Sequence, residues 1–161
     1  SPWSCHGDLI RHSNVGMRNV VEKASHCAWQ IHYHVVFPVK YRRGLLDEAV
    51  VKIIMLTAKE IEERYDIEFE QIGCDKDHVH ILCTAHPKIA PGQIVRVFKS
   101  ITARELFKKK PDLKRDLWGG EFWTDGYYVA TVGERADWGV VERYVKNQGK
   151  PKEDLRQLEL F

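Results

Sequence analysis

The hydrophobic period of the chain changes repeatedly between residues 28 and 148, and this succession limits the possible folds more than any other feature. Residues 28–37 alternate apolar and polar side chains, which is typical of a strand. Three shorter strands are predicted at 67–73, 77–84 and 127–132. Three helices are predicted from the 3.6-residue period of segments 47–65, 91–110 and 134–148.

Local signals define the ends of these helices. Asp47 is a favourable N-cap residue, and Pro91 suits the first turn of a helix. Gly149 and Pro151 would end the last helix. The order β-α-β-β-α-β-α predicts an α+β fold, a ferredoxin-like or RRM-like antiparallel sheet with helices packed on it, followed by a C-terminal helix.

Length and composition are those of one globular domain. The chain has 161 residues and a net charge of +2, and no apolar run reaches the roughly 18 to 20 residues of a membrane span. With no secretory signal visible, we expect a cytoplasmic protein without a membrane partner. Four widely spaced cysteines exclude a sequence-obvious zinc motif and fit reduced thiols. Residues 1–16 are predicted to be a flexible extension, 17–150 a single domain and 151–161 a charged tail.

Two histidines mark the third predicted strand. Because strand side chains alternate between faces, His78 and His80 point the same way, and Val79 and Ile81 point the other way. Two imidazoles at this spacing can bind one divalent metal ion. The alternative is a pair of histidines on a half-exposed sheet without ligand function. A second pair with this spacing, His32 and His34, is interpreted as structural.

The last predicted helix carries a second pair of candidate residues. Tyr144 and Gln148 are four residues apart and therefore neighbours on one helix face. The Gln148 amide oxygen is a hard ligand that would complete two imidazoles for Mg²⁺ or Mn²⁺. The Tyr144 phenol oxygen could attack a phosphodiester. The alternative is a tyrosine packed at the helix edge and a solvated glutamine.

Basic residues gather in two places although the net charge is small. Residues 40–43 form one cluster around an aromatic side chain, and a second cluster begins in the helix at 91–110. Clustered cations beside aromatics can follow a phosphate backbone while bases stack, although solvated helix faces have the same composition. The candidate DNA contacts are Lys40, Tyr41, Arg42, Arg43, Arg96, Lys99 and Arg104. Phe122 and Trp123 would either stack on bases or belong to the core.

Four motifs in order resemble the TnpA-type transposases of small bacterial and archaeal insertion sequences (the insertion sequence 200/605 family), which are single-tyrosine HUH endonucleases. They are YHVVFPVKYRR at 33–43, DHVH at 77–80, LWGGEFWTDGYY at 117–128, and Tyr144 followed four residues later by Gln148. The resemblance covers about residues 24–150. It implies that His78, His80 and Gln148 bind the metal and that Tyr144 is the catalytic nucleophile.

The resemblance also implies a reaction and an assembly. Such enzymes bind hairpins at the ends of their element as single-stranded DNA, cleave through a 5′-phosphotyrosine link and rejoin strands without ATP. They are homodimers in which the tyrosine helix can complete the site of the partner subunit. On this basis Tyr144 and Gln148 could act in trans with His78 and His80.

Two other interpretations remain open from the sequence. One is an HUH nickase with another role, such as a domesticated transposase or a replication initiator. The other is a non-catalytic ferredoxin-like module that binds nucleic acid, because one fold can support many functions. Such a module would display stacking aromatics on its sheet, whereas the third predicted strand displays two histidines.

Overall fold

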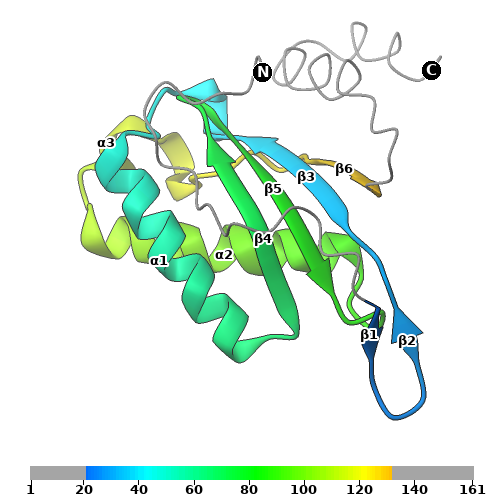
Figure 1. The fold of residues 1–161 in the computed structure, drawn as a ribbon. Coiled ribbons are helices and arrows are strands. Elements are labelled where there is room, and N and C mark those ends of the chain that lie inside the picture. The colour runs from blue at the N-terminus through cyan, green and yellow to red at the C-terminus, as the bar shows by residue number, and fades with distance from the viewer. Residues whose placement is uncertain (1–20, 132–161) are drawn as a thin grey trace, which may run out of the picture.

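The computed structural model describes residues 21–131 (Figure 1). The predicted extension at 1–16, the predicted helix at 134–148 with Tyr144 and Gln148, and the tail at 151–161 lie outside the described residues. The strands are β1 (Glu22–Lys23), β2 (Ala28–Trp29), β3 (Tyr33–Pro38), β4 (Ile67–Cys74), β5 (His78–Ala85) and β6 (Tyr128–Thr131). The α-helices are α1 (Glu48–Arg64), α2 (Pro91–Lys109) and α3 (Leu113–Asp116), and two 3₁₀ turns span Lys40–Arg42 and Trp118–Gly120.

The main sheet confirms the predicted ferredoxin-like arrangement. Its strand order is β4-β5-β3-β6, and every neighbouring pair is antiparallel. Strand β5 therefore lies inside the sheet, bonded to β3 on one side and β4 on the other. Across β3 and β5, Val36 pairs with His80 and Pro38 pairs with His78. This register fixes which side chains of the two strands share a face.

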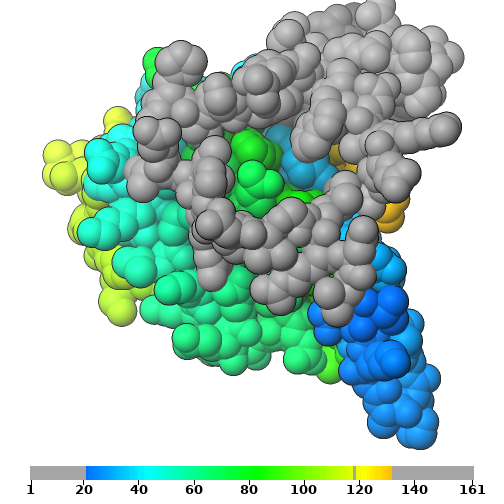
Figure 2. All heavy atoms as spheres, in the orientation of Figure 1, coloured from blue at the N-terminus to red at the C-terminus, as the bar shows by residue number. Residues whose placement is uncertain are grey.

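The predicted strand at 28–37 is divided in the structure. Ala28 and Trp29 pair with Glu22 and Lys23 in a small hairpin, which projects from the rest of the described chain (Figures 1 and 2). The main sheet takes up the chain only at Tyr33, which pairs with Cys83. The alternation of apolar and polar residues indicates which side chains share a face of a strand, but it does not indicate which strand is the partner. It therefore could not predict where the strand divides.

The core lies between the sheet and its two long helices, and α2 passes behind β4 and β5 in Figure 1. Val35 and Phe37 of β3, Val79 and Ile81 of β5, and Ile54 of α1 are almost fully buried in it. Aromatic rings fill its centre, with the Phe37 ring centroid 4.9 Å from that of Trp123. Phe122 is also fully buried, so the structure places Phe122 and Trp123 of the 117–128 motif in the core.

Helix α1 begins and ends as predicted. The Asp47 side chain accepts a hydrogen bond from Val50 N at 2.9 Å and caps the first turn. The 3.6-residue period predicts an apolar stripe of Val50, Ile54, Ala58, Ile61 and Tyr65. This stripe is buried from Val50 to Ile61, whereas Tyr65 at the helix end is exposed.

The 3.6-residue period of 91–110 predicts a buried face with Ile94, Val97, Phe98 and Ile101, and the observed buried face of α2 is rotated relative to this prediction. Its buried residues are Ile94, Val95, Phe98, Thr102 and Leu106, whereas Val97 and Ile101 are only half-buried. Thr102 is buried because its hydroxyl donates to Phe98 O at 2.6 Å and accepts from Trp123 Nε1 at 2.9 Å. This polar contact satisfies a group that hydrophobic periodicity counts as exposed.

The segment predicted as a loop at 111–126 contains two short helical turns, α3 and the 3₁₀ turn at Trp118–Gly120. Within residues 21–131, no helix is both long and apolar enough to span a membrane. The apolar pattern of the strand around Cys83 predicts that this residue belongs to the core. Cys83 is fully buried, and burial raises the pKa of its thiol to about 12.

Candidate metal centre and nucleic-acid interface

The two candidate metal ligands lie on the face of β5 that points away from the helices. Val79 and Ile81 are part of the core under α1 and α2, so the alternating His78 and His80 occupy the opposite face. His78 is buried and His80 is half-buried. The structure therefore places the two imidazoles on one side of an interior strand, as the alternation predicts.

His78 is the inner end of a chain of three polar side chains. Its Nδ1 lies 2.8 Å from Asp77 Oδ1. The other oxygen of this carboxylate accepts from Arg42 Nη2 at 3.1 Å and from Arg42 Nε at 3.2 Å. If Nδ1 carries the proton of this contact, Nε2 carries the lone pair, which is the form that binds metal ions.

His80 lies in a more apolar setting beside a third imidazole. Its ring centroid is 6.2 Å from that of His34 on β3. Burial, together with the nearby His34 and His78, lowers the pKa of His80 to about 4. Burial also lowers the pKa of His34 to about 4. Both rings are therefore neutral at neutral pH, with a lone pair on one nitrogen.

Gly73 of β4 leaves the space that the His80 ring fills. The two residues are cross-strand partners. A Cβ on Gly73 would overlap the imidazole of His80. Only glycine, which has no Cβ, permits this position of the ring.

The histidines that the sequence analysis interpreted as structural have different surroundings. His34 belongs to the same sheet face as His80, because Val36 pairs with His80 and His34 is two residues away. His32 contacts the carboxylate of Glu70, which lies at a bulge in β4. Two separate pairs in the sequence thus become one cluster of three imidazoles and one outlying histidine. Knowledge of the β3–β5 register would have revealed this cluster.

Within residues 21–131, no group of three or more His, Cys, Asp or Glu side chains is arranged to hold a metal ion. A metal at His78 and His80 would therefore need a further ligand from elsewhere. The predicted third ligand, Gln148, lies outside the described residues, as does Tyr144.

The first basic cluster is engaged with the protein itself. Lys40 Nζ donates to Glu121 at 2.8 Å, and this hydrogen bond raises the pKa of Lys40. Arg42 binds Asp77, and Arg43 Nε donates to Asp116 O at 3.4 Å. Tyr41 is 61% exposed, and its φ of 59° is left-handed. Of these residues, Tyr41 and Arg43 are exposed, and all four DNA contacts stay predictions.

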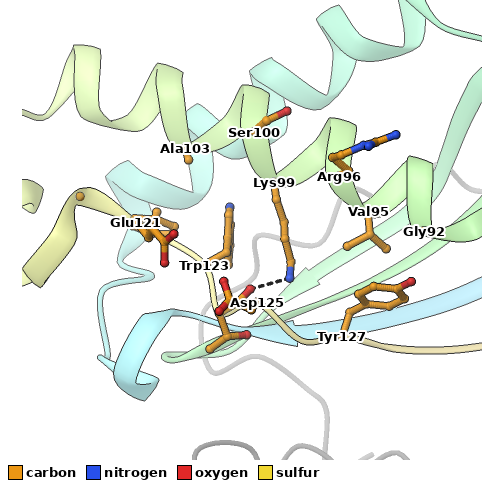
Figure 3. A pocket seen from close by; sticks show the side chains of 13 residues that line it. Gly92, Val95, Arg96, Lys99, Ser100, Ala103, Glu121, Trp123, Asp125 and Tyr127 are labelled. Atoms are coloured by element: carbon orange, nitrogen blue, oxygen red, sulfur yellow. Dashed lines mark hydrogen bonds between the residues drawn. The ribbon is translucent and has the colours of Figure 1, made fainter.

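The cations of α2 lie in two different environments. Arg96 and Arg104 are exposed. Lys99, by contrast, points toward the segment 120–127, and its Nζ donates to Thr124 O at 2.6 Å and Gly126 O at 2.8 Å (Figure 3). Burial lowers the pKa of Lys99 to about 8. Lys99 lies off the apolar stripe of the helix predicted at 91–110. That position did not predict that its side chain fixes the chain before β6.

A pocket of about 410 Å³ lies beside Lys99, between α2 and the segment 120–127 (Figure 3). Trp123 and Tyr127 contribute aromatic walls, and Arg96 and Asp125 line it with charge. No local pattern in the sequence predicts this pocket, because its walls come from segments about 20 residues apart.

The β4-β5-β3-β6 sheet and the histidines displayed by its interior strand define the protein as a ferredoxin-like α+β domain with a candidate metal-binding face. Residues 27–148 match the protein family described as "Transposase IS200 like". The chain belongs to this family of IS200-like transposases.

Individual relatives agree with this assignment. The chain is 30% identical over 128 residues to the ISDra2 transposase TnpA of Deinococcus radiodurans, which covers 80% of this chain and 91% of the relative. It is 29% identical over 124 residues to the transposase for insertion sequence element IS200 of Salmonella typhimurium, covering 77% and 80%. A crystal structure of a protein from Deinococcus radiodurans R1 described as a transposase is similar with a TM-score of 0.72 and 28% identity. That likeness covers 79% of this chain and 97% of the solved one.

Proposed function

We propose that this transposase cleaves and rejoins single-stranded DNA at hairpin ends of its element, with a divalent metal ion and a 5′-phosphotyrosine intermediate. The observation that carries the proposal is the position of His78 and His80 on one face of β5. The contact with Asp77 orients one ring, and Gly73 makes space for the other.

The residues fit a small divalent cation. Two imidazoles and the amide oxygen of Gln148 would form a mixed nitrogen and oxygen set that suits Mg²⁺ or Mn²⁺. A bound ion would polarise the scissile phosphate and stabilise the negative charge that develops on it. The donor set on β5 is held by strand hydrogen bonds on both sides, which favours a fixed ligand geometry.

The reaction has two steps of the same kind. The Tyr144 oxygen attacks phosphorus, the bond from phosphorus to the 3′ oxygen breaks, and the phenol proton leaves while the 3′ oxygen gains one. The products are a 5′-phosphotyrosine and a free 3′-OH. In the second step a 3′-OH attacks a phosphotyrosine, and the bond from phosphorus to Tyr144 breaks. Each step replaces one phosphoester bond by another, which explains why no ATP is needed.

An adduct experiment tests the proposal. The protein is incubated with labelled single-stranded hairpin DNA and Mg²⁺ or Mn²⁺ and analysed under denaturing conditions. We expect a protein–DNA adduct that EDTA abolishes and that Tyr144→Phe also abolishes while DNA binding persists. An adduct that maps to Tyr41, Tyr127 or Tyr128 would refute the assignment of the nucleophile. Binding without cleavage by the wild type would favour a non-catalytic module.

We further propose that the enzyme is a homodimer whose active sites combine His78 and His80 of one subunit with Tyr144 and Gln148 of the other. The supporting argument is the family resemblance. Mixing Tyr144→Phe with a His78→Ala, His80→Ala double variant tests it. In a trans arrangement the mixed dimers regain one intact site, whereas in a cis arrangement the mixture stays inactive.

A further inference from the structure

We propose that Asp77, itself held by Arg42, is a positioning residue that fixes the ring and the tautomer of His78 in the metal centre. This inference rests on the proposed metal-dependent function. The sequence suggested no role for the Asp77 side chain and a DNA contact for Arg42. The inference gives both side chains a role in the metal centre.

The first argument is the direction of the contacts. The Asp77 carboxylate uses one oxygen for His78 Nδ1 and the other for the Arg42 guanidinium. A carboxylate acceptor at Nδ1 selects the tautomer with the proton on Nδ1 and leaves the lone pair on Nε2. Ligand histidines commonly have such a partner behind them, which sets ring orientation and increases ligand basicity.

The second argument is burial. The side-chain exposure decreases along the chain of contacts, from 33% for Arg42 to 24% for Asp77 and 7% for His78. A contact to a buried ring is less screened by solvent than an ordinary surface ion pair. By comparison, Asp112 and Arg115 also form an ion pair, at 2.9 Å, with more than four-fifths of each side chain exposed.

The third argument is the backbone that brings Arg42 to Asp77. Tyr41 and Arg42 have left-handed φ angles of 59° and 51°. Such a conformation is unfavourable for a residue with a side chain. Conformations of this kind persist where surrounding contacts fix them, and they gather at functional sites.

Two backbone hydrogen bonds hold this turn beside the start of β5, the strand that carries His78 and His80. Val39 N donates to Asp77 O at 2.7 Å, and Arg42 N donates to Val39 O at 2.8 Å. The end of β3 is thereby tied to the start of β5, with the Arg42 side chain directed at the Asp77 carboxylate. The basic motif after β3 thus contributes a side chain to the metal centre from 35 positions away in the sequence.

The test measures the His78 tautomer and the metal affinity separately. In the metal-free full-length protein, long-range ¹H–¹⁵N spectra of the imidazoles report which nitrogen of His78 is protonated. We expect the Nδ1–H form in the wild type and a shift toward Nε2–H in Asp77→Ala. Mn²⁺ affinity, followed by electron paramagnetic resonance of the free ion, should fall by about 10- to 100-fold in Asp77→Ala.

Two further variants make the test specific. Arg42→Met should weaken Mn²⁺ binding by less than Asp77→Ala, because the carboxylate remains, and Arg42→Lys should restore part of the loss. Asp112→Ala removes the same charge from an exposed Asp–Arg pair and should leave the tautomer and Mn²⁺ affinity unchanged. Thermal melting checks that each variant is folded, and Asp77→Leu, which keeps a side chain of similar size without an acceptor, replaces Asp77→Ala if that variant unfolds.

The outcomes separate the inference from the proposed function. If the wild type binds Mn²⁺ and folded Asp77→Ala binds it equally well with an unchanged His78 tautomer, the positioning role is refuted and the metal centre stands. If the wild type itself does not bind Mn²⁺ at His78 and His80, the proposed function fails, and the inference fails with it.

Discussion

The imidazole of His80 lies over the backbone of Gly73, its partner on the neighbouring strand. A side chain at position 73 and the observed ring position of His80 therefore exclude each other. Because Gly73 on β4 has no Cβ, the candidate metal ligand His80 on β5 can occupy its observed position.

Gly73→Ala should accordingly weaken the metal centre without removing any ligand. We expect the His80 ring to move and the affinity for Mn²⁺ to fall by about tenfold or more, comparable with the loss of an outer contact. Isothermal titration calorimetry measures the affinity, and the imidazole NMR signals of His80 report the displacement. Gly44→Ala is the matched control, because its Cβ would meet Lys76 only at an ordinary 3.9 Å. Unchanged His80 signals and affinity in Gly73→Ala would contradict this explanation.

Thr102→Val should destabilise the fold by depriving Trp123 of its acceptor. The substitution keeps the side-chain shape but leaves the buried Trp123 Nε1–H without the hydroxyl 2.9 Å away. A buried donor that loses its partner lowers the free energy of unfolding by about 1–3 kcal/mol. Urea unfolding followed by circular dichroism measures this difference.

Thr57→Val provides the comparison for that experiment. Thr57 is also buried on a helix, but the hydrogen bond of its hydroxyl is donated to Ile53 O at 2.7 Å, within its own helix. Its removal deprives no side-chain donor of an acceptor, so the free energy of unfolding should change much less than in Thr102→Val. Equal losses in the two variants would show that the contact with Trp123 contributes little.

Lys99 should lose its proton near pH 8, well below the pH at which an ordinary lysine loses its proton. Its folded pKa of about 8 lies below the ordinary lysine pKa of 10.5 because of burial. Between these values the unfolded chain binds a proton that the folded chain does not, so stability should rise with pH in this window relative to Lys99→Met. Below pH 8 both states are protonated, and the difference between the two proteins should be constant.

The titration of Lys99 can be observed directly from the ¹³Cε chemical shift of its side chain. Lys40 serves as the internal reference, because its hydrogen bond to Glu121 raises its pKa above 10.5. The expected result is a midpoint near pH 8 for Lys99 and one above 10.5 for Lys40. Co-titration of the two lysines would overturn the effect assigned to burial.

Arg96 and Arg104 should carry the salt dependence of DNA binding by α2. Both are exposed on this helix, and eight residues separate them, which corresponds to about 12 Å along the axis. They can therefore contact different phosphates of one strand. Each cation that neutralises a phosphate of single-stranded DNA contributes about −0.7 to the slope of log K against log salt.

Substitution of either arginine by alanine should make this slope less negative by about 0.7, as measured by fluorescence anisotropy with labelled hairpin DNA. Lys59→Ala removes the same charge from an exposed position on α1 and should leave the slope unchanged. If all three variants give the same slope, general charge rather than contacts from α2 would account for binding.

The elements of the fold were predictable where the signal is local. The 3.6-residue period and the Asp47 cap defined α1 to within a residue at each end. The alternation around His78 placed both histidines on one face of β5. These features depend on side chains a few positions apart, which a single sequence displays directly.

The features that were missed depend on partners distant in the sequence. Thr102 is buried because Trp123, 21 positions away in the sequence, donates a hydrogen bond to it. Lys99 is half-buried because the backbone carbonyls of Thr124 and Gly126 accept hydrogen bonds from its ammonium group. The approach of His34 to His80 follows from the register of β3 with β5. Periodicity reports the face of an element and cannot supply the residue that meets it there.

The interior position of β5 also has a kinetic consequence. Backbone amides of a strand bonded on both sides exchange with solvent only when the sheet itself opens, which is a rare event in a stable domain. The amides around His78 and His80 should therefore be among the slowest to exchange in the protein. The backbone of the strand that carries the two imidazoles should therefore stay in place between openings of the sheet, so it need not form anew when DNA arrives.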